Sequence, residues 1–250
     1  MTGTADLIAR FPKQRPPLSE AHSRSYAEEY RLNRDGARAV EGAAKHLEAW
    51  MHRRVRALAG RSPTLELGAG TLNHLPFEPE TREYDIVEPF AALYAQSTLL
   101  PRVRSVFADQ REIPTATRYR RIISIAVLEH MTDLPLELAR SGLLLDADGM
   151  FQAGIPSEGG FLWGLAWRCT TGVSYRLRNG LDYGTQMRHE HVNTAREILA
   201  LVRHFFREVR VARFPLPAHH ASFYTYLEAR APDRDVCARV VAARAEKRAA

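Results

Sequence analysis

The sequence predicts an α/β protein with a doubly wound, mostly parallel sheet and a helical N-terminal arm. From residue 62 onward, short apolar runs alternate with stretches of helical spacing, which is the rhythm of repeated βαβ units. Near the C-terminus, two apolar runs are separated only by the short loop PLPAHH, which indicates an antiparallel strand pair. Before residue 62 no strand is expected, because the apolar residues there recur at helical spacing.

Seven strands are expected along the chain. The run RIISIAV is continuous and rich in β-branched residues, as is typical of a strand that is buried on both faces. Pro156 is expected to end the fifth strand, because proline cannot donate to a sheet ladder. In order, the predicted strands span residues 64–67, 84–87, 103–107, 121–127, 150–155, 209–214 and 222–228.

Helices are expected before and between these strands. Three prolines within residues 1–19 predict an irregular start, and Ser19 is expected to cap a helix over residues 20–36. A stripe of apolar residues predicts a second helix over residues 38–59. The tail from Asp233 is expected to form a marginal helix. Further helices are predicted over residues 90–96, 134–145 and, after a cap at Asn193 or Thr194, up to residue 205.

The composition excludes several classes of protein. Hydrophobic residues make up 45% of the 250 and charged residues 26%, which are ordinary values for a folded globular domain. Cys169 and Cys237 lack CxxC spacing, so neither a disulfide scaffold nor a cysteine zinc site is expected. No apolar run approaches the length needed to span a membrane, and a cytoplasmic protein is predicted. The net charge of +6 is spread along the chain, which argues against a nucleic-acid partner.

The informative residues stand at the carboxyl ends of four predicted strands. The first strand runs into Gly68 and Gly70, which let the backbone turn sharply and approach a ligand. The second ends at Glu88, where a carboxylate can accept hydrogen bonds from ribose hydroxyls. Asp109 follows the third strand and VLEHM ends the fourth. Open α/β sheets bind ligands at this edge, so these residues predict one ligand site.

These motifs together resemble the class I S-adenosyl-L-methionine (SAM)-dependent methyltransferases. The matching segments are LELGAG, YDIVEP, ADQ and SIAVLEHM, which lie in the family's order within residues 62–156. The segments RPPLSEAHSRSYAEEYRLNRDG, GIPSEGGFLW and MRHEHVNTAREI are similar to a narrower bacterial group of small-molecule, type-11/12-like methyltransferases. The resemblance implies a Rossmann-like, seven-stranded sheet with an antiparallel last strand and SAM as the cofactor.

The resemblance also implies a division of the chain and a set of cofactor contacts. Residues 1–61 would form the helical arm or lid and residues 62–230 the SAM-binding domain, with a substrate insert at 157–190 and a tail at 231–250. The two glycines would flank the methionine part, Glu88 would hold the ribose, and Asp109 and Gln110 would lie near adenine. Asn73 stands where the family often has glycine. The full set of predicted cofactor-binding residues is Glu66, Gly68, Gly70, Asn73, Glu88, Pro89, Asp109, Gln110, Ala126, Leu128, Tyr30 and Arg34.

Three histidines are candidates for the base that removes the acceptor proton: His130, His189 and His191. No metal site is predicted, because His189-Glu190-His191 does not have HExxH spacing. The Gly- and aromatic-rich insert is expected to choose the substrate. Its predicted substrate-binding residues are Trp163, Trp167, Tyr183 and Arg188.

Each of these assignments has a purely structural alternative. Asp109 could cap a turn, His130 could orient a loop, and the insert aromatics could pack the insert onto the sheet. Tyr30 and Arg34 could belong to an ordinary packed helix rather than to a lid over the cofactor.

The predicted function is methyl transfer from SAM to an oxygen, with nitrogen second, of a small polar acceptor such as a sugar or secondary metabolite. The alternatives are an NAD(P)-dependent Rossmann oxidoreductase and a non-catalytic SAM-fold binding protein. The missing third glycine of GxGxxG argues against the first alternative, and the intact set of strand-end motifs argues against the second. The expected partner is a small-molecule substrate, with the oligomeric state left open, a homodimer included.

Overall fold

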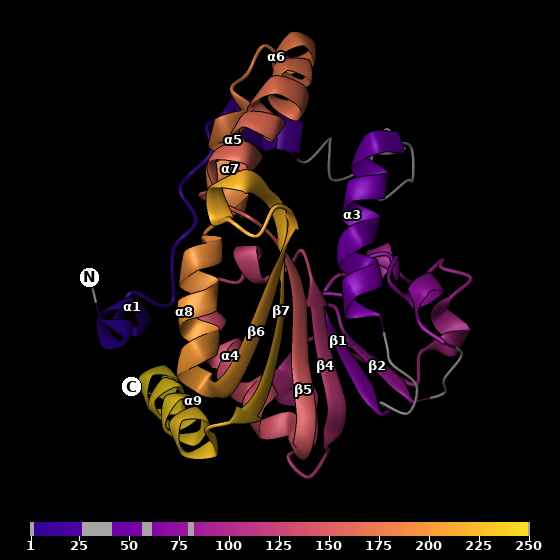
Figure 1. The fold of residues 1–250 in the computed structure, drawn as a ribbon, viewed down its shortest axis with the longest axis vertical. Coiled ribbons are helices and arrows are strands. Elements are labelled where there is room, and N and C mark those ends of the chain that lie inside the picture. Colours follow the sequence, from indigo (N-terminus) through magenta and orange to yellow (C-terminus); the bar gives the residue numbers. More distant parts are fainter. Residues whose placement is uncertain (1–2, 27–41, 57–61, 80–82, 250) are drawn as a thin grey trace.

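The computed structural model describes residues 3–26, 42–56, 62–79 and 83–249. Seven strands form one sheet in the order β3-β2-β1-β4-β5-β7-β6 (Figure 1). All neighbours from β3 to β5 are parallel, whereas β7 is antiparallel to both β5 and β6. The strands are β1 Thr64–Leu67, β2 Tyr84–Val87, β3 Ser105–Phe107, β4 Tyr119–Ile125, β5 Leu145–Pro156, β6 Phe206–Pro215 and β7 Ser222–Pro232. The predicted doubly wound sheet with its antiparallel end is confirmed.

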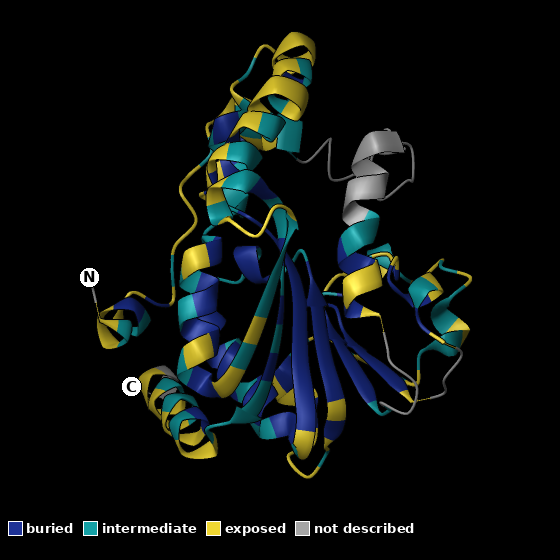
Figure 2. Ribbon diagram, in the orientation of Figure 1, coloured by how far each residue is buried: buried dark blue, intermediate teal, exposed yellow. Residues whose placement is uncertain are grey.

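Helices cover both faces of the sheet. On one face, α4 (Leu134–Leu144), α8 (Ala195–Phe205) and α9 (Arg234–Ala249) share an apolar core with the sheet. On the other face, α3 (Gly42–Val55) packs through Met51 and Val55 onto the central strands. The central strands are accordingly almost entirely buried (Figure 2).

The N-terminal arm is joined to the core of the protein. The short helix α1 (Thr4–Ala9) buries Leu7, and Phe11 lies in the same core cluster as α8. The prediction of an irregular start was therefore wrong for residues 4–9, where Asp6 accepts a hydrogen bond from the Gly3 N–H and closes the first turn. A helical segment follows over residues 20–26, after Ser19 as predicted.

Two other predicted helices differ from the structure. Residues 90–96 form only the single 3₁₀ turn η2 (Ala91–Leu93). Phe90 is 56% exposed, and only Leu93 and Tyr94 of this segment are partly buried, which leaves little packing to stabilise a longer helix. The tail, in contrast, is a full helix, α9, docked on α4. Its Cys237 is completely buried, and its Sγ lies 2.7 Å from where a Cβ on Gly142 would stand. This close approach explains a glycine inside α4.

The insert projects beyond the carboxyl ends of the parallel strands (Figure 1). It starts after β5 and contains α5 (Phe161–Trp167), a π-helical turn η6 (Arg168–Gly172), α6 (Val173–Asn179) and α7 (Tyr183–Glu190). The insert therefore stands at the edge of the sheet where the parallel strands end (Figure 1). Among the described residues, none of the helices is both long and apolar enough to cross a membrane.

Removing the N-cap of α8 is expected to destabilise the protein measurably. Thr194 and Glu197 form a capping box, in which each side chain accepts a hydrogen bond from the other residue's backbone N–H. Thr194→Ala should lower the free energy of unfolding by about 1 kcal/mol in chemical denaturation. The exposed Thr170, whose hydroxyl donates to the Ala166 carbonyl one turn earlier, supplies the control variant Thr170→Ala. Equal stability of the two variants would contradict the role of this cap.

Candidate cofactor and acceptor site

The loop after β1 meets the tip of β2. The Gly70 N–H donates to Glu88 Oε2 at 2.8 Å, and the Phe90 N–H donates to Glu88 Oε1 at 3.0 Å. Gly68 and Gly70 have φ values of +69° and +52°, which favour glycine. No atom lies within 4 Å of where a Gly70 Cβ would stand. The Glu88 carboxylate is therefore held beside an open, glycine-lined turn.

A cleft of about 350 Å³ lies next to this tip, between the ends of β3 and β4. Its lining brings together residues that the sequence placed in two different roles. Asp109 and Gln110 come from the predicted adenine site and His130 from the predicted bases. The complete lining is Val87, Ala108, Asp109, Gln110, His130, Met131, Thr132, Asp133, Leu136 and Glu137.

The side chains of Asp109 and Gln110 are engaged by the protein. Asp109 accepts from both the backbone and the guanidinium of Arg111, so it also caps the turn after β3. Hydrogen bonding from Arg111 lowers the pKa of Asp109. The Gln110 amide donates to Glu137 Oε2 at 2.6 Å and is 3% exposed. Both side chains are thus held by protein partners at the wall of the cleft.

Glu66 lies in the interior, not at the surface of the cleft. It is 2% exposed and accepts a hydrogen bond from the Tyr84 hydroxyl at 2.8 Å. Burial raises the pKa of Glu66 to about 8. Its carboxyl group therefore faces the polar interior beneath α3, two residues before Gly68.

The buried Glu66 carboxyl should make the protein less stable as the pH rises. Its pKa is raised on folding, so its contribution to stability is complete below the unfolded value near 4.5 and is lost progressively toward pH 8. Glu66→Gln removes this titration. From pH 5 to pH 8, the stability of the wild type should fall relative to this variant by on the order of 2 kcal/mol, measured by denaturation at each pH. Parallel pH profiles would mean that Glu66 does not hold its proton on folding.

The turn that carries His130 is clamped from the α7–α8 connection. Fully buried Asn193 donates through Nδ2 to the carbonyls of Leu128 and Met131, at 2.9 and 2.7 Å. The Asn193 N–H donates to the Glu129 carbonyl at 3.1 Å. These bonds fix the turn η5 (Leu128–His130) and with it the directions of the Glu129 and His130 side chains.

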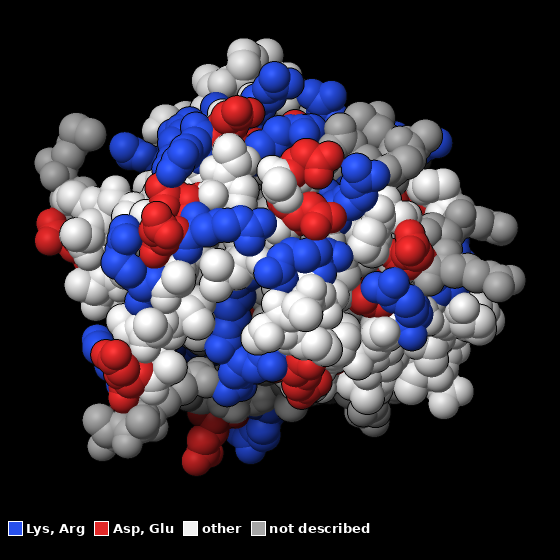
Figure 3. All heavy atoms as spheres, turned by 90° about the horizontal axis from the view of Figure 1, so that it is seen from below, with Lys and Arg blue, Asp and Glu red and all other residues white. Residues whose placement is uncertain are grey.

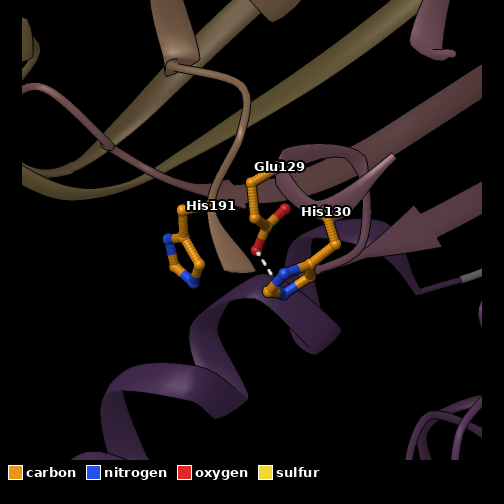
Figure 4. Close-up of side chains that lie close together, drawn as sticks. All are labelled: Glu129, His130 and His191. Carbon is orange, nitrogen blue, oxygen red and sulfur yellow. Dashed lines mark ion pairs between the residues drawn. The ribbon is translucent and has the colours of Figure 1, made fainter. Parts of the chain in front are cut away.

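Glu129, His130 and His191 come together above this turn (Figure 4). One ligand-capable atom from each of the three lies within 4.8 Å of the other two. The His130 and His191 rings meet edge to face, with centroids 4.8 Å apart. Two of the three predicted bases are thus brought to one point, at the His130 end of the cleft.

His191 is oriented by Glu158. Its Nδ1 lies 2.8 Å from Glu158 Oε2, which also accepts from the Trp163 Nε1–H at 2.7 Å. Burial opposes protonation of His191, but the carboxylates of Glu158, Glu129 and Glu190 outweigh it and raise the pKa of this ring. Trp163 therefore has a defined positioning role, and it also packs on Tyr224.

The pKa values of the other two members of the cluster are shifted mainly by burial. Burial, together with the neighbouring His191 ring, lowers the pKa of His130 to about 4. Burial raises the pKa of Glu129 to about 7. Each group is thus disfavoured in its charged form, as expected in a site that is withdrawn from water.

The remaining predicted residues are not part of this cluster. His189 points away from it, with Nδ1 2.7 Å from the Pro16 carbonyl and its ring against Tyr26. Trp167 lines a cleft of about 550 Å³ that also includes Glu158, and it packs on Tyr183. Arg188 lines a cleft of about 570 Å³ that reaches His191.

Asn73 is exposed on the turn after the glycine loop, and Pro89, Ala126 and Leu128 flank the strand ends. Tyr30 and Arg34 lie outside the described residues.

Sequence reasoning missed Glu129, Glu158 and Arg15. Arg15 ties the N-terminal arm to the site by donating to the carbonyls of His130, His189 and Glu190. Glu158 is the second residue after β5, so the strand-end rule that selected Glu88 also applies to it. Glu129 precedes His130 in the same motif. No local signal marks Arg15, because its partners lie more than 100 residues away.

Comparisons with known proteins identify the fold. No protein-family model and no curated protein matches the sequence. Among solved structures, a SAM-dependent methyltransferase from Thermotoga maritima has 14% identity and a TM-score of 0.53, over 84% of this chain and 96% of that one. An O-methyltransferase family protein from Burkholderia thailandensis has 16% identity and a TM-score of 0.53, over 89% and 65%.

A third similar structure carries ligands. It is phosphoethanolamine N-methyltransferase 2 from Haemonchus contortus, in complex with phosphomonomethylethanolamine and S-adenosylhomocysteine. It has 11% identity and a TM-score of 0.50, over 74% of this chain and 52% of that one. Such similarity at low identity establishes architecture, while function has to be argued from the site. With its strand order and antiparallel β7, this chain has the fold of the class I SAM-dependent methyltransferases.

Proposed function

We propose that this protein binds SAM beyond the carboxyl ends of β1 to β4 and transfers its methyl group to an oxygen of a small polar acceptor. The observation that carries this proposal is the Glu88 carboxylate, held at the tip of β2 by the Gly70 N–H. A ribose needs such a carboxylate for its two hydroxyls.

The residues present fit this cofactor. The open space at the Gly70 Cβ position lets a ligand approach the backbone, and the adjoining cleft of about 350 Å³ has the size of a nucleoside site. When bound, SAM supplies a methyl group on a sulfonium that is already activated for transfer. Glu88 would hold the ribose, while the turn at Asp109 and Gln110 would hold the adenine edge.

The acceptor would enter from the insert side. The clefts lined by Trp167 and Arg188 both lead toward the Glu158–His191 pair, which stands between them. A hydroxyl acceptor at this point meets the Glu129–His130–His191 cluster, whose members can take its proton. α5 to α7 and the arm would exclude water, and holding the acceptor in line supplies much of the rate.

A dinucleotide cofactor fits less well. Its pyrophosphate is bound by the N-terminus of a helix that follows the glycine turn. In the described residues 68–79, the glycine turn is followed only by turns and by the 3₁₀ helix η1 (Leu75–Phe77). A nucleic-acid substrate is also not favoured on the face drawn in Figure 3, where basic and acidic side chains are interspersed.

Methyl transfer can be tested directly with SAM labelled in its methyl group. The purified protein is incubated with pools of small hydroxyl compounds, including sugars and glycosides, and with pools of small amines. We expect labelled O-methyl products from a hydroxyl pool and none from Glu88→Ala. Transfer only to amines would overturn the oxygen assignment. Tight binding of SAM without transfer to either class would instead support the non-catalytic alternative.

A further inference from the structure

The cluster of Glu129, His130 and His191 has the donor set of a transition-metal site. We propose that these three side chains bind one divalent cation of the first transition row, such as Zn²⁺ or Co²⁺. Two imidazole nitrogens and one carboxylate oxygen suit such ions better than Mg²⁺ or Ca²⁺, which prefer oxygen. This proposal goes beyond methyl transfer, since it concerns an ion site that can be measured without SAM or an acceptor.

The first argument is the orientation of the two rings. His130 Nδ1 lies 3.1 Å from the Glu190 carbonyl, which can only accept, so the ring proton belongs on Nδ1. His191 Nδ1 faces the Glu158 carboxylate in the same way. The Nε2 lone pair of each neutral ring is then free. Metal-binding histidines have this arrangement, in which the second nitrogen donates to a carbonyl or a carboxylate.

The second argument is the state of the Glu129 carboxylate. The residue is 1% exposed, and its Oε2 has no hydrogen-bond partner among the described residues. Its Oε1 lies 3.8 Å from His130 Nε2, which is too long for a hydrogen bond. A deeply buried carboxylate with so few partners is costly, and a cation bound between Oε1 and His130 Nε2 would neutralise its charge.

The third argument is the surrounding charge. The carboxylates of Glu129, Glu158 and Glu190 all act on His191, while Arg15 and the neighbouring histidine rings act on Glu190 and His130. Such surroundings attract a positive ion. The three ligand atoms lie within 4.8 Å of one another, and a tetrahedral ion with bonds near 2.1 Å needs about 3.4 Å. A side-chain adjustment on the order of 1 Å therefore closes the site.

A cation here would also act on the proposed reaction. It stands at the point where the acceptor hydroxyl is expected and would lower the pKa of a hydroxyl bound to it. The Asn193 clamp on the turn that carries Glu129 and His130 holds two of the ligands in place.

Titration of metal-free protein with Co²⁺ tests the proposal, because Co²⁺ in such a site absorbs visible light. We expect one equivalent to bind and Zn²⁺ to displace it, while millimolar Mg²⁺ does not. Glu129→Gln and His191→Gln should each weaken binding at least tenfold. His220→Ala, in an exposed loop outside the cluster, should leave binding unchanged.

Two further experiments test which side chains bind the ion. His189→Ala should retain Co²⁺ binding, because His189 faces Pro16; loss of binding would move the site to the His189-Glu190-His191 segment. X-ray absorption of the wild-type complex with Zn²⁺ needs no variant, and it should show two imidazoles and oxygen. No binding, displacement by Mg²⁺, or a sulfur ligand would overturn the proposal. None of these results depends on methyl transfer, so a failure here is distinct from a failure of the proposed function.

Discussion

Replacing Arg121 by methionine is expected to lower the free energy of unfolding by about 3–5 kcal/mol, the cost of breaking a buried ion pair by removing one partner. Arg121 is fully buried on β4. Its guanidinium donates to both oxygens of Glu78, at 2.8 and 2.6 Å, and to Gln152 Oε1 and the Val55 carbonyl, each at 2.9 Å. The variant would leave the Glu78 carboxylate buried without its cation.

The network around this pair joins three parts of the protein. Glu78 also bonds to His74 Nε2 at 2.7 Å, and His74 Nδ1 lies 3.0 Å from His52 Nδ1 on α3. Burial alone would raise the pKa of Glu78, but Arg121 and His74 lower it to about 2. The pair therefore ties α3 and the β1–β2 connection to the centre of the sheet.

The neighbouring residue supplies a matched control. Arg120 stands on the same strand with its side chain 50% exposed, and its Asp148 partner lies 3.4 Å away. Arg120→Met should change stability by no more than about 0.5 kcal/mol, because exposed ion pairs contribute little. Chemical denaturation of both variants gives the comparison. If Arg121→Met lowers the free energy of unfolding no more than Arg120→Met does, the buried network does not hold α3 on the sheet.

Replacing Glu88 by alanine is expected to weaken the binding of SAM and of its demethylated product by roughly 100-fold or more. Each hydrogen bond to a charged group contributes about 1.5–3 kcal/mol, and the carboxylate would accept one from each ribose hydroxyl. Glu88→Gln should lose less affinity, because the amide oxygen still accepts one bond. Calorimetric titration with S-adenosylhomocysteine measures both variants.

The control for this prediction is a carboxylate far from the cleft. Glu208 is exposed on β6, so Glu208→Ala should bind like the wild type. Because Glu88 also accepts from the Gly70 and Phe90 N–H groups, circular dichroism has to show that the variant folds. A folded Glu88→Ala protein with undiminished affinity would contradict the role of this side chain.

The sheet could be predicted because its signals are local. The β-branched run of β4 and the alternation of strands with helices are visible in short stretches of sequence. Because open α/β sheets bind ligands at the carboxyl ends of their strands, Glu88 is then expected at the ligand site. Arg121 shows the limit of this reasoning. A charged residue at the start of a strand is ordinarily expected to be exposed. The partner Glu78 lies 43 residues away, in the connection between β1 and β2, and no local pattern shows that this connection packs over Arg121.

The site likewise contains residues that local motifs predict and contacts that only the tertiary fold creates. His130 and Glu88 were found from motif positions, whereas the Glu158–His191 contact spans 33 residues and depends on how the insert folds back. The helix predicted over residues 90–96 failed for a related reason. Its spacing was suitable, but no surface is available to bury Phe90, and local spacing does not carry that information.

The central claim is that the crevice beside Glu88 is a SAM site and not a dinucleotide site. Calorimetric titration of the wild-type protein with S-adenosylhomocysteine, and separately with NAD, tests it most directly. We expect one site per chain with micromolar or tighter affinity for S-adenosylhomocysteine and no measurable heat with NAD. Binding of NAD at that affinity, without binding of S-adenosylhomocysteine, would contradict it.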